Sequence, residues 1–123
     1  MDNFYSDILE FFDNKGITPI SLLNSIKAVD YYRQPNLYIL VPKSSEVINV
    51  WNGYIYHYEF AIIVGSPNLY TFEDMKSNVH KLIGNNLYNE QVYVVYVTKQ
   101  ELDTSVRNFY REIFDITINL VIS

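Results

Sequence analysis

Two long segments of alternating apolar and polar residues constrain the fold of this chain more than any other feature. In residues 54–65, YIYHYEFAIIVG, tyrosine, phenylalanine, isoleucine and valine fill the even positions, while His57 and Glu59 occupy odd positions between them. Residues 108–122 show the same alternation, with Arg111 and Asp115 at odd positions. A period of two predicts β-strands with one apolar face and one mixed face. Both strands are predicted to exceed the usual length of about five or six residues.

A β-hairpin is predicted around the first of these strands. Residues 36–41, NLYILV, indicate a strand between Pro35 and Pro42, because proline is confined to strand ends and edges. Asn52-Gly53 is a strong turn signal, so residues 43–53 are expected to form a long hairpin loop before the strand at 54–64. An apolar centre in this loop either projects as a contact surface or folds back onto the core. It consists of Val47, Ile48, Val50 and Trp51.

Two helices are predicted. Residues 3–15 carry phenylalanine and isoleucine at helical spacing and end at Gly16. Residues 71–83 carry a second apolar stripe, with Thr71 as the N-cap, Asp74 as its capping partner and Gly84 at the end. The tyrosine row of residues 54–65 is expected to pack beneath this second helix. Residues 17–33 fit a short helix and irregular structure equally well.

The order of these segments predicts the fold class. Residues 91–97, QVYVVYV, are apolar on both faces and predict a central strand, followed by a polar connection. Hairpin-linked strands with two helices predict an α+β fold, a single domain over residues 1–123. We expect a mainly antiparallel sheet with long strands and two helices packed on one face.

Charge and composition exclude several classes of protein. The formal net charge of −5, with only nine Lys and Arg, disfavours a sequence-specific nucleic-acid binder, whose affinity comes from cations that neutralise phosphates. The absence of cysteine excludes disulfides and thiolate sites. No apolar run approaches the roughly 20 residues of a membrane-spanning helix, and the acidic N-terminus lacks the basic region of a signal peptide. We therefore expect a soluble protein without a membrane partner.

The sequence offers little that indicates catalysis. His57 and Glu59 share a strand face, and with His80 they would supply three zinc ligands, but no HxxxH or HExxH spacing supports such a site. The chain also lacks a GxSxG nucleophile elbow and a glycine-rich phosphate loop. We expect no enzymatic activity, no catalytic or metal-binding residues and no cofactor.

The remaining features point to contact between proteins. Strands as long as 54–64 and 108–122 leave edges and a mixed face that a domain of this size covers only in part. We therefore predict an assembly protein whose interface combines the apolar loop with the mixed strand faces. The predicted interface residues are Val47, Ile48, Val50, Trp51, His57, Glu59, Arg111 and Asp115.

The arrangement of segments resembles the tail-terminator, or tail-completion, proteins of tailed bacteriophages. An amphipathic N-terminal helix leads into a hairpin with a long loop, a strand ending in YEFAIIVGS precedes a helix in TFEDMKSNVHKLIG, and FYREIFDITINLVI closes the chain. The closing segment is similar to theirs because an aspartate precedes an aromatic stretch and then DITINL. These positions are Asp103, Phe109, Tyr110, Asp115, Ile116 and Ile118.

The resemblance implies a structural virion protein, assembled in the host cytoplasm, that forms a homo-oligomeric ring, typically a hexamer, at the head-proximal end of the tail. Such a ring ends polymerisation of the tail tube and joins the tail to the head connector, while DNA passes through its lumen. Its partners would be copies of itself, the tail tube protein and the head–tail connector protein. The sequence leaves two alternatives open: another neck or adaptor component of a phage, and a small acidic cytoplasmic inhibitor or immunity-type protein.

Overall fold

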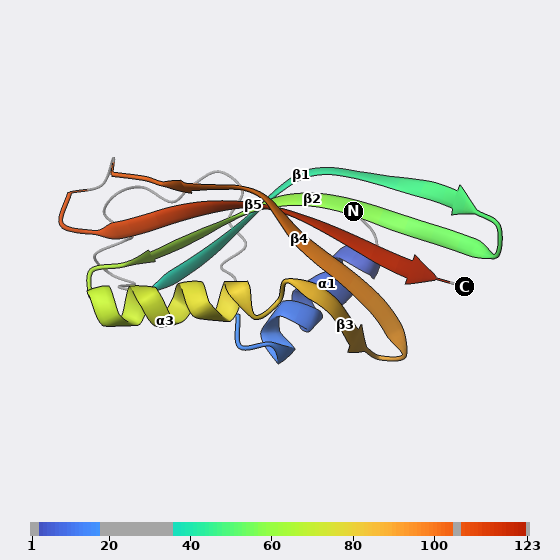
Figure 1. Ribbon diagram of the computed structural model, residues 1–123, viewed down its shortest axis with the longest axis horizontal. Helices are drawn as coiled ribbons and strands as arrows, with labels where there is room; N and C mark the ends of the chain where they lie inside the picture. The colour runs from blue at the N-terminus through green and yellow to red at the C-terminus, as the bar shows by residue number, and fades with distance from the viewer. Residues whose placement is uncertain (1–2, 18–35, 105–106, 123) are drawn as a thin grey trace.

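The computed structural model describes residues 3–17, 36–104 and 107–122 (Figure 1). Within these ranges the chain forms a single small α+β domain with two helices and one five-stranded antiparallel sheet. The strand order is β1-β2-β5-β4-β3. The elements are α1 (Asn3–Asn14), β1 (Leu37–Val50), β2 (Gly53–Ser66), α3 (Leu69–His80), β3 (Gly84–Tyr88), β4 (Gln91–Leu102) and β5 (Tyr110–Ile122).

The two alternating segments form the neighbouring strands β2 and β5, which pair along their whole length. Their register runs from Tyr54 opposite Ile122 to Ser66 opposite Tyr110. Directly paired residues share a face of the sheet, so even positions of β2 meet even positions of β5. We call the side that carries these residues the even face and the opposite side the odd face. The predicted long strands and their two different faces are confirmed.

The hydrophobic core lies on the even face. Tyr58 and Phe60 are buried and stacked along β2, with ring centroids 5.9 Å apart. Helix α1 contributes two phenylalanines to this core. Phe11 stacks on Tyr93 of β4 at 4.5 Å, and Phe12 meets the Phe60 ring edge-on at 6.4 Å. Part of the tyrosine row is therefore buried as predicted, and α1 contributes to its cover.

The predicted end of the first helix is confirmed at Gly16. Gly16 has a φ of 85°, its N–H donates to the Asp13 carbonyl, and the Ile17 N–H donates to the Phe12 carbonyl. This pair of bonds is the Schellman motif, which satisfies the last carbonyls of a helix. Phe12 and Ile17 are both fully buried, as the accompanying hydrophobic contact requires. From residue 18 onward, the segment predicted as helix or irregular structure lies outside the described residues.

Helix α3 begins earlier than predicted. Asn68, rather than Thr71, is the N-cap, and its side chain accepts a hydrogen bond from the Thr71 N–H. Asparagine is as good an N-cap as threonine or better, and it stands three residues upstream, where it satisfies the N–H of Thr71 itself. The predicted apolar stripe is buried except for its last member, Ile83, which is 45% exposed beyond the helix end. Phe72 stacks on Tyr110 of β5 at 5.7 Å.

The prediction of a hairpin loop at residues 43–53 was wrong. Residues 43–50 continue strand β1, and only Trp51 and Asn52 form the turn before β2. Pro42 does not end the strand, because β1 lies at the edge of the sheet, where proline is tolerated. The pairing of β1 with β2 shifts by one residue between Pro42 and Ser44, so Lys43 has no direct partner in β2. The result is a hairpin that extends to one end of the molecule (Figure 1).

The polar connection predicted after residue 97 was wrong in part, and one strand was missed. Strand β4 continues to Leu102, with a register shift between Val97 and Lys99. The short strand β3 pairs with the first half of β4 through a turn at Asn89 and Glu90, which both have positive φ. Its sequence, GNNLY, contains a glycine and two asparagines, residues that are depleted in strands.

The close approach of the Phe109 ring to Gly65, near the end of β2, can be tested by substitution. A Cβ at this position would overlap the Phe109 ring, whose Cζ atom would lie 3.1 Å away. We therefore expect Gly65→Ala to lower the free energy of unfolding by about 1–3 kcal/mol, the usual cost of overpacking. Urea unfolding measures this loss.

The cost should shrink in a Phe109→Leu background, where the added methyl group has room. Equal unfolding midpoints for Gly65→Ala and the unaltered chain would contradict the packing described here.

Candidate interaction surface

The predicted apolar residues gather at the end of the β1–β2 hairpin. Trp51 is 96% exposed, Val47 is 53% exposed, and the others are exposed by about two-fifths to a half. We call this group the tip cluster. It consists of Val47, Ile48, Val50, Trp51 and Tyr54. Exposed apolar residues grouped this way on a projecting element are typical of contact sites for another molecule.

A second apolar group crosses the odd face near the same end of the sheet, with one residue on each of the five strands. Each residue is the direct partner of the next one in the neighbouring strand: Ile48 pairs with Ile55, Ile55 with Val121, Val121 with Val92, and Val92 with Leu87. We call these five residues the apolar row. Leu87 is 72% exposed, and Ile48, Val92 and Val121 are also exposed. Because Ile48 belongs to both groups, the apolar row meets the tip cluster on the odd face, while Val47 and Tyr54 of the tip cluster lie on the even face.

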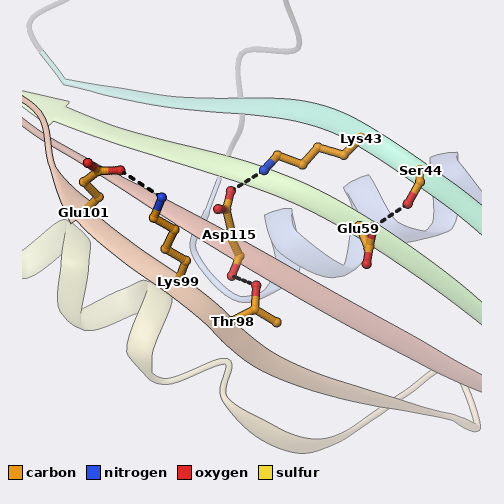
Figure 2. A network of polar contacts seen from close by, with 7 residues as sticks. All are labelled: Lys43, Ser44, Glu59, Thr98, Lys99, Glu101 and Asp115. Atoms are coloured by element: carbon orange, nitrogen blue, oxygen red, sulfur yellow. Dashed lines mark hydrogen bonds and ion pairs between the residues drawn. The ribbon is translucent and has the colours of Figure 1, made fainter.

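Polar side chains lie farther along the odd face (Figure 2). Asp115 is six residues along β5 from Val121 of the apolar row, or roughly 20 Å. Lys43 of β1 reaches across β2 to Asp115 of β5, with Nζ 2.6 Å from Oδ1. The β2 partner of Asp115 is Ala61, whose small side chain leaves room for this crossing. Thr98 donates its hydroxyl to the Asp115 carbonyl, which ties β4 to the same point. We call the groups drawn in Figure 2 the polar band.

His57 and Glu59 lie on the odd face, as predicted, and interact with each other. The His57 Nδ1 donates to Asn119 Oδ1 at 2.7 Å, and its Nε2 lies 3.6 Å from Glu59 Oε1. Ser44 donates its hydroxyl to the other oxygen of Glu59 at 2.6 Å. The hydrogen bond from Ser44, followed by that from His57, lowers the pKa of Glu59 below its usual value of 4.5.

The structure does not bring together the three residues weighed as zinc ligands. His80 packs edge-on against Phe114, an even-face residue of β5, at 5.5 Å, while His57 and Glu59 lie on the odd face. In the part of the chain that the structure describes, no group of three or more His, Cys, Asp or Glu residues could hold a metal ion. None of the helices within residues 3–17, 36–104 and 107–122 is long and apolar enough to span a membrane.

Arg111 lies away from the other predicted interface residues. Its Nε is 3.2 Å from Asp103 Oδ2, and both side chains are largely buried. Arg111 is four residues from Asp115 along β5, or roughly 13 Å. The structure therefore separates the predicted interface into three parts: the tip cluster, the polar band with the neighbouring His57, and the Arg111–Asp103 pair at the far end.

Sequence reasoning missed the residues that extend the apolar surface beyond the hairpin. Leu87 belongs to the unpredicted strand β3, and Val92 and Val121 were assigned only to strands, without a role. Their signal was present: Val92 and Val121 occupy the face opposite to their buried neighbours Tyr93 and Leu120. Only the register between strands shows that these residues line up.

No protein-family model matches this chain, and no curated protein was found to be similar to it. Its function is therefore argued from the geometry of the surfaces described above.

The pKa of Glu59 tests the arrangement of the odd face. Its folded-state pKa is lowered, so this carboxylate stabilises the fold above the unfolded value of 4.5, and the contribution is lost as the pH falls through the folded pKa. We expect Ser44→Ala to raise the pKa of Glu59 towards 4.5, because it removes the largest cause of the shift. Titration of the side-chain carboxyl carbon by NMR measures this change.

Ser45→Ala is the matched control, since Ser45 pairs with Tyr58 rather than Glu59. An unchanged Glu59 titration in Ser44→Ala would show that the Ser44 hydrogen bond does not hold this carboxylate.

Proposed function

We propose that this protein is an assembly protein that binds copies of itself through its projecting hairpin and odd face. The observation that carries the proposal is the exposure of two apolar groups, the tip cluster and the apolar row, that meet at Ile48. Trp51, in the turn of the hairpin, is 96% exposed. Leu87, on the edge strand β3 at the other side of the sheet, is 72% exposed. Aromatic residues are enriched where proteins bind one another, and an apolar surface that crosses a whole sheet is stabilised by a partner that covers it.

The placement of the helices supports the same proposal. Phe11 and Phe12 of α1 contact even-face residues of the sheet, and so do Phe72 and His80 of α3. We infer that both helices pack on the even face, below the sheet in Figure 1. The exposed part of the odd face, near the hairpin, is then left for another molecule and includes Ile48, Val92 and Val121. The polar band on the same face would then favour one orientation of the partner, since charged groups at interfaces contribute mainly to specificity.

The more specific form of the proposal is a ring at the head-proximal end of a phage tail. In this role the protein ends polymerisation of the tail tube and joins the tail to the head connector. A ring component needs surfaces for its neighbours and for the proteins above and below it. The apolar groups that meet at Ile48 are one surface of this kind, and the outer edge of β1 is another. A net charge of −5 would weaken adhesion of passing DNA to a lumen that carries these acidic groups.

Self-association is the direct test of this proposal. We expect light scattering after size exclusion to show a mass that rises with concentration to a fixed limit, and negative-stain images of the same fractions to show rings. Trp51→Ser should raise the concentration needed for half-assembly at least tenfold, because it removes the most exposed apolar group of the tip cluster. A loss of this size is about 1.4 kcal/mol per interface.

Ile83→Ser is the matched control, because Ile83 is an exposed apolar residue outside the tip cluster and the apolar row. It should assemble like the unaltered chain. A strictly monomeric protein at every concentration, or equal assembly of Trp51→Ser and the unaltered chain, would contradict the proposal and favour an inhibitor-type or adaptor role.

A further inference from the structure

A cavity lies at the end of the sheet opposite to the tip cluster. Its volume is about 570 Å³, and it is formed by the turn between β2 and α3, the end of β4 and the beginning of β5. Pro67, Leu102 and Tyr110 contribute apolar walls, and all three are exposed to solvent. Phe109, which is buried, also lines it. The cavity is thus open to the surface and lined by both apolar and polar groups.

The tip cluster cannot reach this cavity within one molecule. Strand β2 has 14 residues, with Gly53 at the tip and Ser66 next to Pro67 of the cavity. Thirteen steps of about 3.3 Å place these ends roughly 43 Å apart. In Figure 1 the β1–β2 turn and the β4–β5 connection lie at opposite ends of the sheet. A contact between the two surfaces therefore joins different copies head to tail.

The chemistry of the cavity matches an inserted tryptophan. The exposed Arg107 offers a guanidinium group that stacks on an indole face, and Tyr110 offers an aromatic wall. The Thr104 hydroxyl and the Asp103 carboxylate are acceptors for the indole N–H. Tryptophan and arginine are the residue types that most often dominate the energy of protein interfaces.

Size and charge agree with the same occupant. Pockets of about 300–1,000 Å³ enclose a drug-sized molecule, which is larger than one indole ring. The cavity therefore has room for Trp51 together with its neighbour Val50. Residues 44–56 contain one charged side chain, Glu46, and no lysine or arginine. The charged residues that line the cavity are two arginines, Arg107 and Arg111, and one aspartate, Asp103. The cavity therefore has a net positive charge, which is complementary to the negative charge of Glu46 on the hairpin.

We propose that the tip cluster of one copy inserts into this cavity of the next copy, with Trp51 between Arg107 and Tyr110. The contact is heterologous, because each copy offers its hairpin at one end and its cavity at the other. Repetition of such a contact closes a ring if the rotation between copies permits, and otherwise gives a filament. This inference rests on the proposed self-assembly and identifies the interface that produces it.

Cysteine cross-linking tests this interface, since the chain has no cysteine of its own. Asn52→Cys places a thiol beside Trp51, and Thr104→Cys places one at the cavity. A disulfide forms only where Cα atoms approach to about 4.4–6.8 Å. Mixing the two single variants under mild oxidation should give a cross-linked dimer that contains one of each. The doubly substituted chain should give a ladder of covalent oligomers.

Lys81→Cys is the matched control for Thr104→Cys. Lys81 is exposed and caps the far end of α3, whose 12 residues place it about 18 Å along the helix from the cavity. Mixed with Asn52→Cys, the Lys81→Cys variant should give less than a tenth of the cross-linked dimer that Thr104→Cys gives. Arg107→Glu provides a second readout and should raise the concentration for half-assembly at least tenfold.

The outcomes distinguish this inference from the proposed function. Cross-linking of Asn52→Cys to Thr104→Cys, well above the Lys81→Cys control, supports the interface. Assembly seen by light scattering, but with equal cross-linking at both positions, overturns the interface and leaves self-assembly standing. A protein that neither assembles nor cross-links at any concentration overturns both.

Discussion

The full-length pairing of β2 with β5 is the constraint on which the rest of the structure depends. Because side chains alternate along both strands, one register fixes which residues enter the core and which remain outside. Tyr58 opposite Ile118, and Phe60 opposite Ile116, are buried on the even face. A shift of the register by one residue would exchange the buried set with the polar band. The core and the proposed contact surface are thus two results of the same pairing.

The same pairing explains why apolar residues remain exposed in a small domain. Individual aromatic side chains, such as Phe11 of α1 and Phe72 of α3, contact even-face residues, while the long β1–β2 hairpin extends apolar residues beyond the core. On the odd face, Lys43 and Asp115 form an exposed pair that is worth at most about 1 kcal/mol of stability. Such a pair contributes more to the orientation of a partner than to folding. In the proposed assembly, the charged groups of this face would orient the partner that its apolar groups bind.

Much of the fold could be predicted from the sequence, because its strongest signals are local. The period of two in residues 54–65 and 108–122 and the helical spacing before Gly16 each led to an element that the structure contains. The turn signal at Asn52-Gly53 was also useful, although the structure places the turn one residue earlier, at Trp51 and Asn52. The errors came from tertiary context. Proline at position 42 is compatible with a strand only at a sheet edge, and GNNLY forms a strand only because β4 pairs with it.

The candidate site was less predictable than the fold. Trp51 and its neighbours were recognised because several large apolar residues adjoin a turn. The apolar row and the cavity were not, since each combines residues from distant parts of the chain. Leu87 and Ile48 lie on the opposite edge strands and share a row only through the register of five strands. A single sequence carries no local signal for that alignment.

Hydrogen–deuterium exchange at low and high protein concentration tests the central claim, self-assembly through the hairpin, most directly. If copies associate through this element, amides near the turn, in residues 47–54, gain protection at high concentration. Amides in the paired centre of β2 and β5 are protected at both concentrations and serve as the internal reference. Unchanged exchange at residues 47–54, in a sample that light scattering shows to be assembled, would contradict the claim.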